Sequence, residues 1–228
     1  MARAVDCLEV GRMREIVCLD KDAECVASFT DGGLLDELVQ HLRRGALVVY
    51  PTETLYGLGA DPFNREAIDR VFRVKRRPRT MGQAVAVARV DDFDAVADVP
   101  DWAWDLVSKF EAVSVAFLLP KRKEVPKQLT GGRASIVVRA VHHPLAIALT
   151  EAAGPLISTS ANLHGKEPPR TMEEARDMLG DAVDYYIDSG EAPVQSPSTI
   201  IEPLPDGDVR ILREGVVTSD WLDEMLGE

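Results

Sequence analysis

The sequence has few cysteines and no long hydrophobic run. Its three cysteines, Cys7, Cys18 and Cys25, all lie near the N-terminus, without a C-x-x-C pair or a nearby histidine cluster. This number and spacing argue against a disulfide framework and against a zinc site, so we expect buried or idle thiols. No run of about 18 apolar residues is present, and charged residues interrupt the first twenty, which argues against a transmembrane helix and a signal peptide. We therefore expect a cytoplasmic protein.

Positive charge is also scarce. The 228 residues include 26 lysines and arginines against 38 aspartates and glutamates, which gives a formal net charge of −12. This balance argues against a general nucleic-acid-binding protein, because such proteins normally have a basic face. A local basic cluster is therefore more informative here than it would be in a basic protein. Apolar residues make up 46% of the chain, which predicts a globular core.

Several familiar motifs for nucleotide binding and catalysis are missing. The chain has no G-x-x-x-x-G-K-S/T sequence, and hence no P-loop. The segment Gly57–Gly59 begins like a G-x-G-x-x-G fingerprint, but Pro62 occupies the last glycine position, which excludes a Rossmann site. Neither a nucleophile elbow nor an H-E-x-x-H metal motif is present. Any chemistry must therefore come from another arrangement of residues.

Hydrophobic periodicity and turn residues predict a mixture of helices and strands. Helices are expected over 31–44, 64–78, 143–154, 171–180 and 219–226, with two helical stretches across 91–110. Strands are expected over 46–50, 83–89, 113–120, 135–139, 155–162, 183–188, 197–203 and 209–215. Asn64 is expected to cap one helix, and Thr171 with Glu174 forms a capping-box pattern. The sequence predicts a single α/β domain with a twisted mixed β-sheet flanked by helices.

Three of these strands lead directly into polar residues. The three segments run from Pro51 to Gly59, from Ser135 to Pro144 and from Ser158 to Asn162. Ligands of open α/β sheets commonly bind beyond the carboxyl ends of strands, so we expect the segments to converge on one pocket. Their hydroxyl groups can donate to anionic oxygens, and the glycines are expected to allow close approach of a ligand to the backbone.

A fourth segment is strongly basic. Five cations lie between positions 73 and 79: Arg73, Lys75, Arg76, Arg77 and Arg79. Compensation of the helix dipole accounts for one or two of them. Arginine and lysine suit the oxygens of a triphosphate, so the cluster favours phosphate binding over a merely solvated helix end.

The segments VVYPTETLYGLGAD, KRRP, SIVVRAVHHP and ISTSANLHG follow one another in the order and spacing of the YrdC-like family of threonylcarbamoyl-AMP synthases. The resemblance covers about residues 35–215, including the final strands SPSTII and VRILREG. It implies a YrdC-like fold of the short, single-domain type, with a concave basic groove. Residues 31–228 would form the catalytic domain. Residues 1–30 would be an N-terminal extension of unknown role, either an added strand or an interaction arm.

The resemblance also implies an activity. A nucleotidyltransferase of this family condenses L-threonine, bicarbonate or CO2 and ATP into threonylcarbamoyl-AMP and releases pyrophosphate. A partner transferase then uses this product in tRNA modification. Mg²⁺ would arrive on the ATP phosphates, since no protein metal motif is present. The family's groove also allows weak RNA binding, so a non-catalytic RNA-binding module of the same fold is the alternative. A carbamoyl-adenylate domain of the hydrogenase-maturation type is a third hypothesis.

Site residues follow from the same resemblance. The expected catalytic residues, which would hold the triphosphate and the acyl-phosphate centre, are Lys75, Arg77, Ser160 and Asn162. Two further residues, Ser135 and Arg213, are expected near the nucleotide. Threonine is expected to contact Thr52, Tyr56, Arg139 and Ser158, with Arg139 facing its carboxylate.

Some positions leave alternatives open. Gly82 and Gln83 stand where many family members have Pro-Leu, so residues 79–84 are a candidate lid. Glu53 is interpreted as a structural carboxylate that accepts backbone N–H bonds, with a general base as the less favoured reading. His142 and His143 precede a predicted helix, which favours capping or packing over proton transfer.

Overall fold

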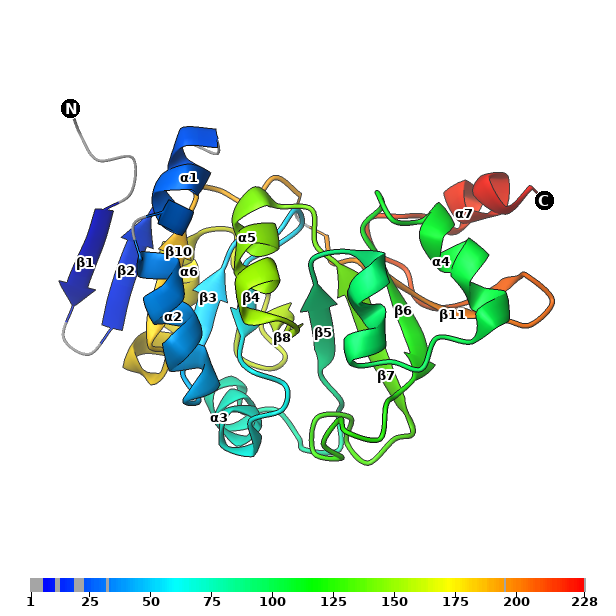
Figure 1. Cartoon of the computed structure of the whole chain (residues 1–228), viewed down its shortest axis with the longest axis horizontal. Helices are drawn as coiled ribbons and strands as arrows, with labels where there is room; N and C mark the ends of the chain where they lie inside the picture. Colours follow the sequence, from blue (N-terminus) through cyan, green and yellow to red (C-terminus); the bar gives the residue numbers. More distant parts are fainter. Residues whose placement is uncertain (1–5, 11–12, 19–22, 32, 195, 228) are drawn as a thin grey trace.

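The computed structural model describes residues 6–10, 13–18, 23–31, 33–194 and 196–227 (Figure 1). Strands within these ranges form two six-stranded sheets, and helices cover both. The predicted class, a single α/β domain flanked by helices, is confirmed. The strands divide into two mixed sheets, whereas the sequence predicted one. Among the described residues, no helix has both the length and the apolar character needed to cross a membrane.

The first sheet has the strand order β1-β2-β10-β3-β4-β9. Its strands are β1 (Asp6–Val10), β2 (Met13–Val17), β10 (Tyr185–Asp188), β3 (Val48–Tyr50), β4 (Gly57–Gly59) and β9 (Thr159–Ser160). Strand β10 pairs in parallel with both β2 and β3, and the other pairs are antiparallel.

The second sheet has the order β12-β11-β6-β7-β5-β8. Its strands are β12 (Val209–Arg213), β11 (Thr199–Pro203), β6 (Val115–Pro120), β7 (Ser135–Ala140), β5 (Ala84–Val87) and β8 (Leu156–Ile157). The pairs β11–β6 and β5–β7 are parallel. Most of these strands are apolar and buried, as expected for strands covered by helices and loops.

The two sheets meet at Ser158. This residue separates β8 of the second sheet from β9 of the first. Its N–H donates to the carbonyl oxygen of Ala84 over 2.8 Å, and the Ile157 N–H donates to that of Ala60 over 2.8 Å. A single short segment of chain is therefore bonded to β5 on one side and to the end of β4 on the other. We call Ser158 and its flanking strands the sheet junction.

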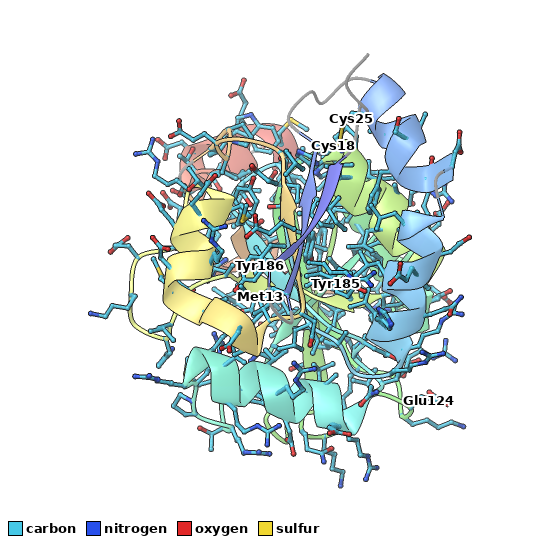
Figure 2. All side chains as sticks on the ribbon, turned by 90° about the vertical axis from the view of Figure 1, so that its left-hand side faces the viewer. Met13, Cys18, Cys25, Glu124, Tyr185 and Tyr186 are labelled. Atoms are coloured by element: carbon cyan, nitrogen blue, oxygen red, sulfur yellow. A yellow bond between two sulfur atoms is a disulfide. The ribbon has the colours of Figure 1, made fainter. Side chains whose placement is uncertain are left out.

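Helices cover the first sheet on both faces. Figure 2, viewed towards its β1 edge, shows α1 (Ala23–Asp31), α2 (Leu34–Arg43) and α5 (Pro144–Ala153) on one face and α6 (Met172–Leu179) on the other. Helix α3 (Arg65–Lys75) lies across one end of the strands. The second sheet carries α4 (Trp104–Lys109), α7 (Ser219–Leu226) and the short 3-10 helices η1 (Val90–Ala95) and η2 (Asp101–Ala103), and η3 (Gly180–Ala182) follows α6.

The predicted helices and strands are confirmed with ends shifted by a few residues. Asn64 caps α3, because its Oδ1 accepts from the N–H groups of Glu66 and Ala67 over 3.0 and 3.1 Å. The capping box at α6 is only half formed. Thr171 accepts from the Glu174 N–H over 3.2 Å, but the Glu174 carboxylate accepts from the Arg170 N–H.

The N-terminal segment contains elements that the sequence did not predict. Its two strands extend the edge of the first sheet, and α1 packs against α2 and α5. The described part of residues 1–30 therefore forms added strands and a helix of the domain itself. The division at residue 30, which falls within α1, stays a prediction.

The expectation of idle thiols is wrong for two of the three cysteines. Cys18 and Cys25, both fully buried, form a disulfide between the end of β2 and α1 (Figure 2). An odd cysteine count cannot exclude a local pair, and the Cα atoms of these two residues lie 6.0 Å apart. The side chain of Cys7 lies outside the described residues.

Candidate active site

A cavity of about 400 Å³ opens at the sheet junction. Its walls come from both sheets: β4 and β9 of the first, and β5, β6, β7, β11 and β12 of the second. The three polar segments identified in the sequence all reach it, through Thr52 and residues 54–57, through residues 135–137 and Arg139, and through residues 158–160. The volume is in the range typical of sites for small molecules and cofactors.

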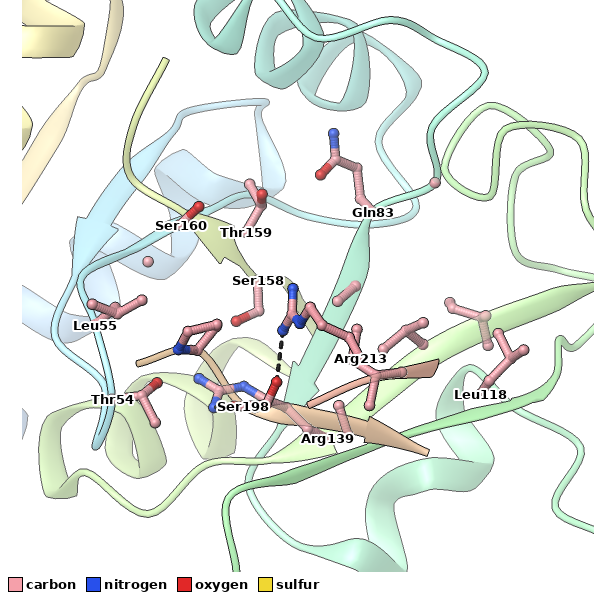
Figure 3. A pocket seen from close by; sticks show the side chains of 18 of the residues that line it. Thr54, Leu55, Gln83, Leu118, Arg139, Ser158, Thr159, Ser160, Ser198 and Arg213 are labelled. Carbon is pink, nitrogen blue, oxygen red and sulfur yellow. Dashed lines mark hydrogen bonds between the residues drawn. The ribbon is translucent and has the colours of Figure 1, made fainter. Parts of the chain in front are cut away.

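Most of the predicted site residues line this cavity. They are Thr52, Tyr56, Arg77, Ser135, Arg139, Ser158, Ser160 and Arg213. Figure 3 shows Ser158, Ser198, Arg139 and Arg213 gathered in one part of it and Thr159 and Ser160 in another. Two predicted residues, Lys75 and Asn162, do not line the cavity. The roles predicted for all ten residues stay predictions.

Lys75 lies behind the cavity wall. Its side chain, 1% exposed, donates from Nζ to the carbonyl oxygen of Ser160, to that of Asn162 over 2.8 Å and to Asn162 Oδ1 over 3.0 Å. The Ser160 hydroxyl donates to the same Oδ1 over 2.6 Å. Burial lowers the pKa of Lys75 to about 7, and the positive charge of Arg77 adds to this effect. Lys75 therefore fixes the Ser160–Asn162 loop from behind.

Arginine dominates the charge of the cavity. The described lining residues include Arg77, Arg133, Arg139 and Arg213 and no carboxylate. Burial lowers the pKa of Arg213, and the charges of Arg139 and Arg77 lower it further, which places these three cations within electrostatic reach of one another. Closely spaced guanidinium groups repel each other unless anions lie between them. Glu53 lies beside Arg139, and the other arginines concentrate positive charge on the cavity wall.

Comparison with known proteins agrees with this geometry. The family model named Sua5/YciO/YrdC, described as "Telomere recombination", matches residues 40–215. A threonylcarbamoyl-AMP synthase of Idiomarina loihiensis is 40% identical over 164 residues, which cover 69% of this chain and 87% of that protein. This chain belongs to the Sua5/YciO/YrdC family.

Solved structures of the family have the same fold. The structure of Pyrococcus abyssi Sua5 complexed with L-threonine is 30% identical, has a TM-score of 0.79, and matches 85% of this chain and 57% of its own. Escherichia coli YciO is 31% identical, with a TM-score of 0.74, and matches 83% of this chain and 92% of its own. This chain therefore shares the fold of both family members over most of its length.

Two of the residues predicted to contact threonine, Thr52 and Tyr56, already form hydrogen bonds within the protein. The Thr52 hydroxyl donates to the carbonyl oxygen of Leu55 over 2.7 Å and accepts from two backbone N–H groups of the same turn. The Tyr56 hydroxyl donates to the carbonyl oxygen of Gly190 over 2.6 Å, and burial raises its pKa to about 12. Both side chains shape the wall, and the hydroxyl of Tyr56 points into the protein.

Glu53 is a structural carboxylate, as its favoured interpretation predicted. Its Oε1 accepts from Arg139 Nη1 over 2.6 Å, and its Oε2 accepts from the His142 N–H over 3.2 Å. Burial alone would raise the pKa of Glu53, but Arg139 and the hydrogen bond from His142 outweigh burial and hold that pKa well below its usual range. The Glu53 carboxylate also interacts with the His142 ring, whose Nδ1 lies 3.9 Å from Oε1, and this interaction raises the pKa of His142. Glu53 thus fixes Arg139 and the start of the 141–144 segment.

The Tyr50 ring restricts both glycines of β4, while Gly57 also lines the cavity, so its predicted role in ligand approach stays a prediction. A Cβ at Gly59 would lie 2.8 Å from Cε1 of Tyr50, and one at Gly57 would lie 3.2 Å from it. The Tyr50 ring covers β4 across the antiparallel β3–β4 pair. The glycines are therefore required by an internal aromatic ring. The same fact explains why β4, which the sequence predicted as a loop, forms a strand despite its two glycines.

Several residues that line the cavity were not predicted from the sequence. Ser198 precedes β11 and accepts from Arg139 Nη1 over 2.7 Å through its hydroxyl, while its carbonyl oxygen accepts from Arg213 Nη2 over 2.7 Å. Arg133 follows Gly131, whose φ of +62° and close approach to the carbonyl of Thr80 require glycine. The G-G-R sequence was the available signal for that loop. Nothing in the local sequence around Ser198 indicated its two arginine partners.

Unpaired polar atoms also concentrate at this site. In the part of the chain that the structure describes, the buried side-chain nitrogens and oxygens without a hydrogen-bond partner belong to Tyr50, Arg77 and Gln83. Arg77 and Gln83 line the cavity, and Tyr50 packs beneath Gly57. Buried polar groups are almost always paired in folded proteins, and exceptions commonly mark functional sites. The cavity wall therefore has hydrogen-bonding capacity available for a ligand.

Proposed function

We propose that this protein is an L-threonylcarbamoyladenylate synthase, which condenses L-threonine, bicarbonate or CO2 and ATP and releases pyrophosphate. The observation that carries the proposal is the arginine-lined cavity at the sheet junction, where the K-x-R and S-x-N segments of this family meet. Family members named threonylcarbamoyl-AMP synthase, including that of Idiomarina loihiensis, support it. So does the L-threonine complex of Pyrococcus abyssi Sua5.

The proposed reaction has two steps. The amine of threonine first takes up bicarbonate to give an N-carboxylate (a carbamate) and water. One carbamate oxygen then attacks the α-phosphorus of ATP, forming a C–O–P linkage as the bond from that phosphorus to pyrophosphate breaks. Two anions must approach each other, so charge neutralisation and alignment should carry most of the catalysis. Arg77 and Arg213 face the cavity and are suited to that task.

Arg139 is suited to the carboxylate of threonine. Its contacts with Glu53 and Ser198 both engage Nη1, and the residue lines the cavity, so the rest of the guanidinium can receive a second carboxylate. Arginine pairs with carboxylates through two parallel hydrogen bonds. Ser158, at the sheet junction beside Ala84, would contact the same substrate.

The nucleotide fits the remaining wall. Ala116, Leu118, Val137 and Ile200 give the second sheet an apolar floor that suits a purine ring, and Ser135 stands beside it. The described residues contain no group of three or more His, Cys, Asp or Glu side chains placed to hold a metal. Mg²⁺ would therefore enter with the ATP phosphates, where it offsets their negative charge.

The biological setting follows from the product. Threonylcarbamoyl-AMP is a reactive mixed anhydride, and we propose that a tRNA threonylcarbamoyl transferase consumes it in the cytoplasm. A non-catalytic RNA-binding role is the alternative. The four arginines in the cavity would serve either ligand, but a cavity of about 400 Å³ suits a nucleotide better than an extended RNA backbone.

Pyrophosphate release from ATP tests the proposal. Purified protein should release pyrophosphate only when L-threonine and bicarbonate are both present. Arg213→Met should reduce turnover at least about tenfold, because it removes one charged hydrogen-bond donor. Arg210→Met is the matched control, since Arg210 lies on the same strand but is exposed and paired with Glu202. Turnover without threonine would contradict the proposal, and RNA binding without any turnover would favour the alternative.

A further inference from the structure

Gln83 is a buried glutamine whose amide has no hydrogen-bond partner. The residue is 3% exposed, and both Oε1 and Nε2 are unpaired. Its backbone is well fixed, because its N–H donates to the carbonyl oxygen of Leu129 over 2.8 Å and the neighbouring Ala84 carbonyl accepts from Ser158. An unpaired buried amide is unfavourable for folding. The unpaired amide therefore points to a role of Gln83 in ligand binding, since it forms no hydrogen bond that would stabilise the fold.

The position of Gln83 within the cavity is defined by strand register. Strand β5 pairs antiparallel with β8 so that Val85 faces Ile157. Continuing this register past the strand ends places Gln83 opposite Thr159, and Figure 3 shows Gln83 on the same side of the cavity as Thr159 and Ser160. Arg77 lies on this side too, since its Nη2 donates to the carbonyl oxygen of Gly82 over 3.0 Å.

The donor and acceptor pattern of an amide restricts its ligand. Phosphate oxygens only accept, so a phosphate would satisfy Nε2 and leave Oε1 unpaired. A purine edge could satisfy both atoms, but the apolar floor that suits a base includes Leu118, on the other side of the cavity from Gln83 (Figure 3). The N-carboxylate of threonine offers an N–H donor next to oxygen acceptors, and it must lie between the threonine and the phosphates.

We propose that Gln83 is a specificity-determining residue that binds this carbamate, with Oε1 accepting its N–H and Nε2 donating to its non-attacking oxygen. The proposal rests on the proposed function. Gln83 lines the cavity, so its side chain belongs to the wall that the carbamate would meet. The interaction distinguishes carbamoylated threonine from free threonine, whose ammonium group donates but cannot accept.

Substitution of Gln83 by leucine tests the proposal. Gln83→Leu should lower kcat/KM for L-threonine about tenfold at fixed bicarbonate, the effect of one or two lost hydrogen bonds, and leave the KM for ATP within about twofold. Gln83→Glu should be worse, because it adds a negative charge beside two anions. Gln40→Leu is the matched control, since Gln40 is an exposed glutamine on α2. Kinetics of Gln83→Leu equal to those of the control would overturn the proposal.

Two further measurements separate binding from packing. N-methyl-L-threonine gives a carbamate without an N–H, so it should be about tenfold poorer than threonine for the wild type and nearly equal to threonine for Gln83→Leu. Because leucine removes an unpaired amide, Gln83→Leu should also raise Tm by about 2–4 °C while it lowers activity. An equal N-methyl penalty in both proteins, or a fall in Tm together with activity, would overturn the proposal. A wild type that releases no pyrophosphate with threonine and bicarbonate would instead remove the proposed function on which it rests.

Discussion

Lys75 Nζ lies 2.8 Å from the carbonyl oxygen and 3.0 Å from the side-chain oxygen of Asn162. This contact joins the basic end of α3 to the polar loop after β9. The K-x-R and S-x-N segments are therefore one structural unit, in which Arg77 and Ser160 face the cavity and Lys75 and Asn162 hold them from behind.

Replacing Lys75 by methionine should loosen this unit. Three oxygen acceptors would lose their donor in a buried site, which should cost about 2–4 kcal/mol of unfolding free energy. Turnover in the pyrophosphate assay should fall more than the affinity for ATP, because the lysine does not line the cavity. Lys123→Met is the control, since the Lys123 side chain is 92% exposed. A large loss of ATP affinity in a stably folded Lys75→Met protein would show that Lys75 contacts the nucleotide directly.

The same lysine should give the protein a distinct pH dependence. Burial lowers the pKa of Lys75 from 10.5 to about 7 in the folded chain. Between these two values the unfolded chain binds more protons than the folded chain, so this group makes the unfolding free energy rise with pH across that window. Urea unfolding at pH 7 and pH 9 should show a larger rise for the wild type than for Lys75→Met. Equal slopes would mean that Lys75 stays fully protonated when folded.

Glu53→Gln should remove the ion pair between residue 53 and Arg139. The variant keeps the shape of the side chain but leaves the buried guanidinium without its carboxylate, at a cost of about 3 kcal/mol. The pKa of His142, which Glu53 raises, should fall in the variant, because burial and Arg139 are then opposed only by the hydrogen bond to the Glu111 carbonyl. NMR titration of the four histidines should resolve this change. An unchanged His142 titration would contradict the described network.

Glu53 and His142 change the unfolding free energy with pH in opposite directions. The lowered pKa of Glu53 stabilises the fold above the usual value of 4.5, and this contribution is lost as the pH falls. The raised pKa of His142 stabilises it below 6.5, and this contribution is lost as the pH rises through the folded pKa. The stability difference between wild type and Glu53→Gln should therefore be largest between about pH 4.5 and 6.5.

Gly59→Ala should destabilise the β3–β4 pair. The added methyl group would lie 2.8 Å from the Tyr50 ring and 3.1 Å from Val48 Cγ1, which should cost about 1–3 kcal/mol by overpacking. A smaller residue at position 50 should relieve part of this cost. A double-mutant cycle with Tyr50→Val measures that coupling. Additive effects in the cycle would place the requirement for glycine elsewhere.

Local signals in the sequence were enough for most of the fold. Asn64 and the apolar stripe after it define α3, and Gly154 ends α5 as predicted, because capping and periodicity act within a few residues. Strand β4 was missed, and the segment of β1 and β2 was left open between an added strand and an interaction arm. Their identity depends on partners far away in the chain, β10 for β2 and Tyr50 for the glycines of β4, and a window of neighbouring residues does not include these partners.

In the candidate site too, features set by neighbouring residues were predicted and features set by distant partners were not. The polar segments after strands were recognisable, and they meet in one cavity. The sequence could not show that Lys75 is turned away from that cavity, or that Ser198 bridges two arginines, since both facts depend on how strands from different sheets are placed. It also could not show that the predicted single sheet would divide at Ser158.

The cavity takes its walls from almost the whole length of the chain, from Thr52 near the start to Arg213 near the end. During synthesis, β3 and β4 leave the ribosome long before β11 and β12, and domains form from their N-terminal parts onward as these emerge. A nascent chain that still lacks Arg213 has neither its last wall nor its full positive charge. Binding of the proposed nucleotide should thus appear only after Arg213 has left the ribosome, which makes ATP affinity a reporter of that stage of synthesis.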